Sequence, residues 1–277
     1  MALHPLQAAF QWVSPLPALP NVGWMASMIP TPSVPSVNLR DIPENGLEGM
    51  HRVDLVKALD TLTPISSKQL FASLRNLTKQ HEVFQPKTIL PGTVRHLLDL
   101  PYEVAIEVVD DQSYLTTGAD VYIMGIIGWC PASEALLSTH LHTHPVGIRY
   151  PSLGDVSFQI NRELMRLANR YSIELTSLLA HRGGITVYRA PQTARIQNFI
   201  AKAARWNLSH PTEAGSFSEL LDADVLELTG KNWRGASDDE VDEITRQYVY
   251  ASGMIVREVP WRDKAGIAAL VQLLNPT

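Results

Sequence analysis

Residues 140–155 of this chain read HLHTHPVGIRYPSLGD, and this stretch decides which fold the sequence predicts. His142 and His144 alternate along a strand-like segment, and side chains on a strand alternate between its faces, so both imidazoles point to one side. A proline follows and turns the chain. Ser152 stands three residues before Asp155, where a new helix begins. The pattern therefore predicts a strand, a turn and a helix, with a carboxylate at the helix N-terminus that can return to the histidines.

Two imidazoles and one carboxylate make a donor set that suits zinc. Three protein ligands, with a fourth position left for water, are typical of a catalytic zinc rather than a structural one. A zinc ion lowers the pKa of a coordinated water from about 15.7 to about 7, which gives a nucleophile at neutral pH. The sequence therefore predicts one Zn²⁺ per chain, held by His142, His144 and Asp155.

The pattern His142-x-His144-Pro145, followed by Ser152-x-x-Asp155, resembles the signature of the JAMM (MPN+, JAB-domain) zinc metalloproteases. The resemblance covers roughly residues 88–190. It implies that the two histidines and the aspartate bind zinc, and that Ser152 is catalytic and hydrogen-bonds the oxyanion of the tetrahedral intermediate. It also implies a JAB/MPN-like mixed β-sheet core flanked by helices, with the layering of cytidine deaminases.

The resemblance further implies a glutamate at the start of an early strand, which takes a proton from the attacking water and passes it to the leaving amine. Glu103 opens the expected strand at 104–109 and is the preferred catalytic glutamate. Glu107 lies on the same strand face and is the main alternative. Glu134 and Glu82 remain as further alternatives.

The fold class expected from the pattern is α/β (α+β), because β-rich segments alternate with amphipathic ones between residues 92 and 190. Strands are expected at 104–109, 120–129, 135–141, 176–180 and 185–189, and helices at 93–100 and 156–171. Residues 182–184, Arg-Gly-Gly, read as a hairpin turn between the last two strands.

Four regions are expected along the chain. Residues 1–47 hold eight of the nineteen prolines and are expected to form a poorly ordered leader. Residues 48–87 are predicted to be a helical appendage, 88–192 the JAB/MPN-like catalytic core, and 193–277 a mostly helical extension. The expected elements of that extension are a helix from about residue 194, a second helix opened by the capping box Ser237-x-x-Glu240, a strand at 254–259 and a helix at 265–274.

Composition excludes several classes of protein. The formal net charge of −5 gives no basic footprint, so no nucleic-acid partner is expected. No apolar run approaches the roughly 18 residues of a membrane span, so no membrane association is expected either. Cys130 is the single cysteine, which rules out an intramolecular disulfide and fits a reducing compartment. We expect a soluble, cytoplasmic protein; its oligomeric state stays open.

The expected function is that of a zinc-dependent peptidase or isopeptidase. By resemblance, its substrate would be a peptide or the C-terminus of ubiquitin or a ubiquitin-like protein. One alternative is a RadC-like protein connected with DNA metabolism or mobile elements, although neither a helix-hairpin-helix segment nor a basic surface is visible in the sequence. Another is a non-catalytic binding module that zinc stabilises.

Other histidines and acidic residues have simpler interpretations. His140 shares the strand face of the expected ligands and is expected to be packed or to contact them. His181 precedes the Gly-Gly turn and is expected to be exposed. Asp110 and Asp111 are expected to form a turn at a strand end, and Cys130 to be a small buried side chain.

Overall fold

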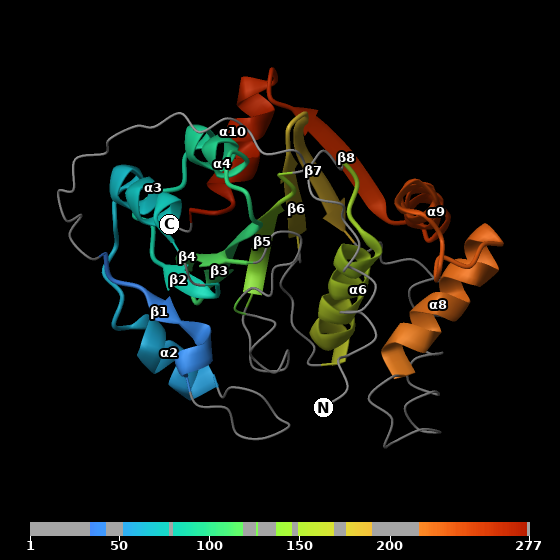
Figure 1. Cartoon of the computed structure of the whole chain (residues 1–277), viewed down its shortest axis with the longest axis horizontal. Helices are drawn as coiled ribbons and strands as arrows, with labels where there is room; N and C mark the ends of the chain where they lie inside the picture. Colours follow the sequence, from blue (N-terminus) through green and yellow to red (C-terminus); the bar gives the residue numbers. More distant parts are fainter. Residues whose placement is uncertain are drawn as a thin grey trace, which may run out of the picture.

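Eight strands form one mixed sheet in the computed structural model, which describes residues 34–42, 52–77, 80–118, 126, 137–145, 149–168, 176–189 and 216–275 (Figure 1). The strands are β1 (Val37–Asn38), β2 (Glu82–Phe84), β3 (Val104–Val109), β4 (Gln112–Thr117), β5 (Leu137–Thr143), β6 (Thr176–His181), β7 (Gly184–Arg189) and β8 (Ile255–Pro260). Their order is β1-β2-β4-β3-β5-β6-β7-β8. The pair β5–β6 is parallel, and each other neighbouring pair is antiparallel.

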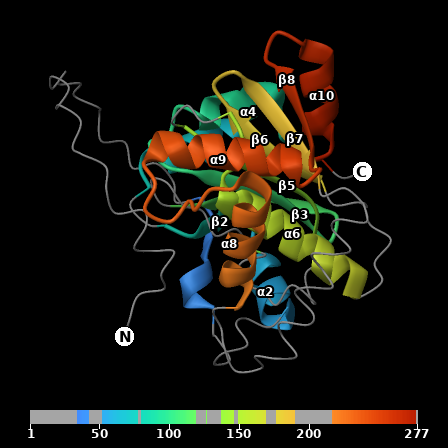
Figure 2. The same cartoon turned by 90° about the vertical axis from the view of Figure 1, so that its right-hand side faces the viewer.

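Helices cover both faces of this sheet. They are the short 3₁₀ helix η1 (Leu39–Asp41), α2 (Arg52–Leu59), α3 (Ser67–Arg75), α4 (Pro91–Leu97), α6 (Leu153–Ala168), α8 (Ser216–Thr229), α9 (Asp238–Ala251) and α10 (Lys264–Gln272). Helices α3, α4 and α10 lie on one side of the sheet, and α6, α8 and α9 lie on the other (Figures 1 and 2). The fold is thus mixed α/β. Among the described helices, none has the length and apolar character needed to cross a bilayer.

The face under α3, α4 and α10 is a mainly apolar core. Its strands contribute Ile106, Leu141, Leu178 and Ile185, all fully buried. The helices contribute Leu70, Leu74, Val94, Leu97, Ile267 and Val271. The side chain of Asn275, just past α10, closes this layer because it bonds both the N–H and the C=O of Ile89, at 2.8 and 2.9 Å. Burial of this many aliphatic side chains is the main favourable contribution to folding of the sheet.

The opposite face carries two apolar clusters with polar side chains between them. One cluster joins α6, α8 and α9 through Val156, Val225, Ile244 and Tyr248 over the β6–β7 end of the sheet. The other joins α2 to the β2–β4 end. The candidate metal ligands lie between these clusters, so apolar packing on both sides holds the polar groups in place.

The pairing register brings the important side chains of β3 and β5 together. Ala105 pairs with His142, and Glu107 pairs with His140. Side chains alternate along each strand, so Glu107, His140 and His142 share the face covered by α6. The register shifts beyond this pair, because Val109 pairs with Leu137 and β5 thus has one residue more than β3 in this interval. Register therefore decides which acidic side chain lies beside which histidine.

Several expected elements are confirmed. Strand β3 has the expected bounds. Strand β7 matches the second strand of the expected hairpin. The capping box of Ser237 and Glu240 begins α9, as expected. Asp110 and Asp111 form the expected turn, both at positive φ, between β3 and β4. The late strand and final helix appear as β8 and α10. The strand expected at 120–129 lies outside the described residues except for residue 126, and the helix expected from about residue 194 lies wholly outside them.

Other elements differ from expectation. The sheet extends beyond residues 88–192, because β1, β2 and β8 belong to it. Residues 48–87 were expected to be helical, yet β2 lies within them, and its Val83 and Phe84 are buried on opposite faces. A strand of three residues is too short for an alternating pattern to stand out in sequence. Helix α3, from the same region, packs into the apolar core through Leu70 and Leu74.

Candidate metal centre

His142 and His144 lie at the end of β5, in the middle of the sheet. His142 is flanked by Ala105 of β3 and Leu179 of β6. His144 follows the strand, and its backbone N–H donates to Ala180 O at 2.9 Å, which continues the pairing with β6. The two residues are 1% and 7% exposed. Neighbouring strands therefore fix both imidazoles inside the protein and on one face of the sheet.

Asp155 comes from the first turn of α6, and Ser152 caps that helix. The backbone N–H of Ser152 donates to Asp155 Oδ2 at 2.7 Å, and the Ser152 hydroxyl donates to the same oxygen at 2.8 Å. In return, the N–H of Asp155 approaches Ser152 Oγ at 3.2 Å. This reciprocal arrangement satisfies N–H groups that the helix itself leaves unpaired, and it fixes the carboxylate.

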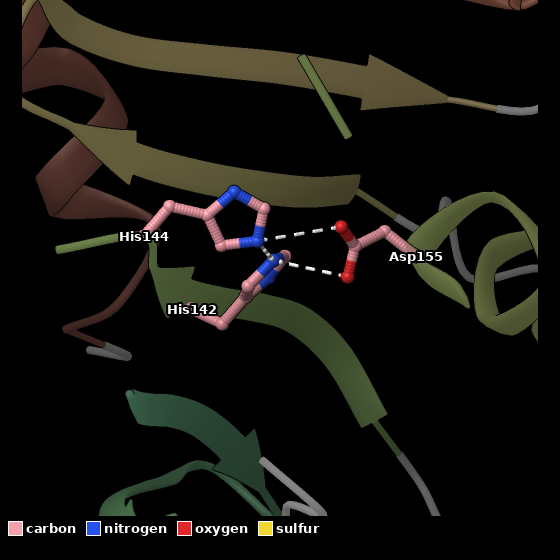
Figure 3. Close-up of side chains that lie close together, drawn as sticks. All are labelled: His142, His144 and Asp155. Atoms are coloured by element: carbon pink, nitrogen blue, oxygen red, sulfur yellow. Dashed lines mark hydrogen bonds and ion pairs between the residues drawn. The ribbon is translucent and has the colours of Figure 1, made fainter. Parts of the chain in front are cut away.

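The three side chains converge on one point (Figure 3). The Nε2 atoms of His142 and His144 are 3.2 Å apart. Asp155 Oδ1 lies 3.0 Å from His142 Nε2, and Oδ2 lies 3.6 Å from His144 Nε2. Tetrahedral coordination with bonds of about 2.0–2.1 Å separates neighbouring ligand atoms by about 3.3 Å, so these distances fit a bound ion. The described residues thus contain a buried His142–His144–Asp155 group that could bind a metal ion.

Electrostatics also favour deprotonated Asp155. Burial disfavours its ionised form, but the charge and hydrogen bond of His142, the charge of His144 and the bond from Ser152 together hold its pKa well below the usual range. Burial likewise disfavours protonated His142, but Asp155 and then Glu103 outweigh this effect and raise its pKa above 6.5. Asp155 and Glu103 thus make the surroundings of His142 Nε2 favourable for a positive charge.

Glu103 lies beside the centre, directly before β3. Its Oε1 is 3.8 Å from His144 Nε2, and its side chain is 12% exposed. Burial raises its pKa to about 8, an effect that the charge of His142 opposes and that of Asp155 reinforces. A carboxyl group with this pKa can exchange protons near neutral pH, which is what a general base or acid requires.

The alternative glutamates lie elsewhere. Glu107 contacts His140, with Oε1 3.3 Å from His140 Nδ1. Glu82 is on β2 and accepts a hydrogen bond from Asn38 at 2.9 Å. Strands β4 and β3 separate β2 from β5, so Glu82 is remote from the histidines. Glu134 lies outside the described residues. Among the described candidates, Glu103 is the glutamate closest to the metal-binding group.

A second set of buried polar groups lies deeper along α6. Arg162 Nη1 donates to Ser177 Oγ at 3.0 Å, and Ser177 Oγ donates to Gln159 Oε1 at 2.5 Å. These residues are not among those predicted from the sequence. A signal was present, since Gln159 and Arg162 follow Asp155 at four and seven residues and therefore share its helix face.

The expected exposure of His181 is wrong. His181 is fully buried at the end of β6, with Nε2 3.1 Å from Thr186 Oγ1 and Nδ1 accepting from Gly183 N–H at 3.0 Å. Its carbonyl also accepts from the indole of Trp261 at 2.9 Å. Gly183 and Thr186 are close to His181 in sequence, but Trp261 comes from beyond β8, so a local pattern could not reveal that contact.

Comparison with known proteins yields no match. No protein-family model, no curated protein and no solved structure matches this chain. A chemical role for this centre therefore has to be argued from its geometry and not from a relative.

Proposed function

We propose that the protein is a zinc-dependent metallopeptidase or isopeptidase of the JAMM type, with a JAB/MPN-like fold. One observation carries the proposal: a buried group of His142, His144 and Asp155 with the carboxyl group of Glu103 3.8 Å from one of its ligand atoms. Three protein ligands beside a separate proton-transfer group are the arrangement found in hydrolytic zinc sites.

The donor set supports zinc as the metal. Two neutral imidazoles and one carboxylate suit this borderline ion, whereas magnesium and calcium prefer oxygen ligands alone. Zinc bound at this site would polarise the scissile carbonyl and lower the pKa of the attacking water. The low pKa of Asp155 keeps its carboxylate ionised and ready to bind a cation at neutral pH.

Glu103 and Ser152 have separate roles in this proposal. Glu103 accepts a proton from the attacking water and delivers it to the leaving amine. The hydroxyl of Ser152 donates to Asp155, so its first role is to orient that ligand. Stabilisation of an oxyanion by the same hydroxyl requires it to turn away from Asp155, and the backbone N–H of Ser152 would then hold the carboxylate alone.

Restricted exposure supports an extended substrate. The side chains of His142 and His144 are 2% and 9% exposed, whereas that of Asp155 is 18% exposed. A substrate carbonyl therefore has to reach the centre from the side of Asp155 and Glu103. A flexible tail can enter such a restricted opening more readily than the surface of a folded protein can. The C-terminal tail of ubiquitin or of a ubiquitin-like protein meets this requirement, and we propose such a tail or a similar peptide as substrate.

The test of this function begins with metal content. Purified wild type, His144→Ala and Asp155→Ala are compared by mass spectrometry, with His96→Ala as a control that removes an exposed histidine of α4. We expect one zinc per chain in the wild type and in the control, and none in the other two variants. A wild type without zinc, or variants that keep it, would refute the metal site.

Hydrolysis is measured next, on a ubiquitin-like protein whose C-terminus carries a fluorogenic amide. We expect zinc-dependent cleavage by the wild type and a loss of at least about 100-fold in Glu103→Gln, because a general base contributes about 10²–10⁴ in rate. A protein that binds zinc, unfolds when zinc is removed and cleaves neither tails nor peptides would instead be a zinc-stabilised binding module.

A further inference from the structure

No described residue gives the candidate ligand His142 the support that metal-binding histidines usually have. Such a histidine normally donates its second ring N–H to a carboxylate, a carbonyl or water, and that bond fixes the plane of the ring. In the described part of the chain, Nδ1 of His142 is buried and has no hydrogen-bond partner. Asp155 contacts only Nε2 of this ring, so on the Nδ1 side no described residue orients it through a hydrogen bond.

Packing against two other imidazoles provides the orientation. The ring of His144 lies 4.9 Å from the ring of His142 at an interplanar angle of 67°. On the other side, the ring of His140 lies 5.4 Å away at 34°. His140 in turn packs against Phe158 of α6, with ring centroids 4.9 Å apart. The ring of His142 is thus confined between two neighbours, only one of which is a candidate ligand.

His140 is itself held firmly. It is 5% exposed, and its Nδ1 lies 3.3 Å from Oε1 of Glu107, its partner across the β3–β5 pair. The other oxygen of Glu107 accepts the backbone N–H of Ile126 at 2.5 Å. Glu107 is fully buried, so both of its oxygens are committed to fixing neighbouring groups. A buried carboxylate used in this way rigidifies the groups around it.

We propose that His140, anchored by Glu107, is a positioning residue of the metal centre, which sets the ring plane of His142 by packing rather than by a hydrogen bond. The inference rests on the proposed metal site. It gives Glu107 a structural role at the centre, distinct from the proton transfer assigned to Glu103. It also predicts that the aromatic ring at position 140 supplies most of the effect and that the bond between its Nδ1 and Glu107 supplies a smaller part.

The test uses zinc affinity, measured by competition with a chelating dye, in the full-length protein. The variants are His140→Ala, His140→Phe and Glu107→Ala, with Ile106→Ala as a control for general destabilisation on the opposite face of β3. We expect His140→Ala to weaken zinc binding by about 10- to 100-fold, the usual effect of losing a supporting group, and His140→Phe to restore most of that loss. Glu107→Ala should weaken binding by about tenfold, and Ile106→Ala should leave it unchanged.

A second readout is independent of turnover. The visible absorption of the Co²⁺-substituted protein reports the geometry of the ligands. It should change most in His140→Ala and less in Glu107→Ala and His140→Phe, which keep an aromatic ring at position 140 and lose only its bond with Glu107. Wild-type affinity and spectrum in His140→Ala, or a His140→Phe that loses as much as His140→Ala, would overturn the inference. If His140→Ala does not fold, Glu107→Ala decides, and an unchanged affinity and spectrum in that variant overturns it.

The outcomes for the wild type separate this inference from the proposed function. A wild type that binds no zinc refutes both. A wild type that binds zinc and hydrolyses nothing refutes the peptidase proposal alone, and the positioning role of His140 is then still decided by the variants.

Discussion

Both hydrogen bonds that Ser152 donates to Asp155 end on a single carboxylate oxygen, Oδ2. The other oxygen, Oδ1, faces His142 Nε2 at 3.0 Å. The residue that caps α6 therefore also fixes the candidate ligand Asp155. A substitution at Ser152 should change the metal affinity as well as the stability of the helix.

Replacing Ser152 tests this coupling. Ser152→Ala should cost the metal-free protein about 1 kcal/mol of unfolding free energy, as loss of an N-cap usually does. It should also weaken zinc binding by about tenfold, because the carboxylate loses one of its two fixing bonds. Urea unfolding and zinc competition measure the two effects, and Ser152→Thr, which keeps the hydroxyl, is the control. Full zinc affinity in Ser152→Ala would mean that the backbone N–H suffices to orient Asp155.

The raised pKa of Glu103 predicts a pH-dependent stability of the metal-free protein. Since the folded chain favours the protonated carboxyl, this group stabilises the fold below its ordinary pKa of 4.5, and the contribution is lost as the pH rises through about 8. Relative to Glu103→Gln, wild type should therefore lose on the order of 4 kcal/mol between about pH 5 and about pH 8.5. Chemical unfolding of both proteins in the presence of a chelator measures this difference. Glu258→Gln, an exposed carboxylate on β8, should follow the wild type; parallel curves for wild type and Glu103→Gln would contradict the prediction.

Zinc should stabilise the folded chain through the same three ligands. Binding to the folded state alone contributes about 2.7 kcal/mol when free zinc exceeds its dissociation constant about 100-fold. Thermal unfolding should therefore shift upward with added zinc in the wild type and return after chelation. Asp155→Asn keeps the shape of the side chain and should abolish the shift. A shift of equal size in that variant would show that zinc binds elsewhere.

Helix α3 should contribute to the stability of the whole sheet rather than to a separate appendage. Leu74 is 1% exposed within the apolar core, and its carbonyl accepts a hydrogen bond from Tyr102 at 2.8 Å. Leu74→Ala should lower the unfolding free energy by about 2–5 kcal/mol within one cooperative transition. Val53→Ala, at a position that is 62% exposed, should change it by less than about 0.5 kcal/mol. A separate early transition in Leu74→Ala would instead indicate an independent helical unit.

The candidate site could be predicted from the sequence because its main parts depend on residues that are close together in the chain. Alternation of His142 and His144 and the cap formed by Ser152 and Asp155 are set by neighbours within a few residues. The same is true of β3, six consecutive buried residues, and of the Gly-Gly turn between β6 and β7.

What the sequence could not supply is pairing over long distances. Nothing near Glu82 indicates that a strand of three residues will join β4, and nothing near His181 indicates that Trp261 will cover it. The contrast between Glu103 and Glu107 depends on register. Glu103 directly precedes β3 and is four residues from Glu107, and only the pairing with β5 places Glu107 against His140. A shift of two residues would exchange their neighbours without changing any local pattern.

The closure of the apolar layer by α10 and Asn275 has a consequence for the newly made chain. The candidate metal ligands span only residues 142–155, whereas the layer on the other side of the sheet is sealed by residues that leave the ribosome much later. During synthesis, the segment that carries the candidate ligands is therefore complete before the residues that seal the core beneath it. A chain that ends before α10 would hold all three candidate ligands on a sheet whose apolar layer is still open.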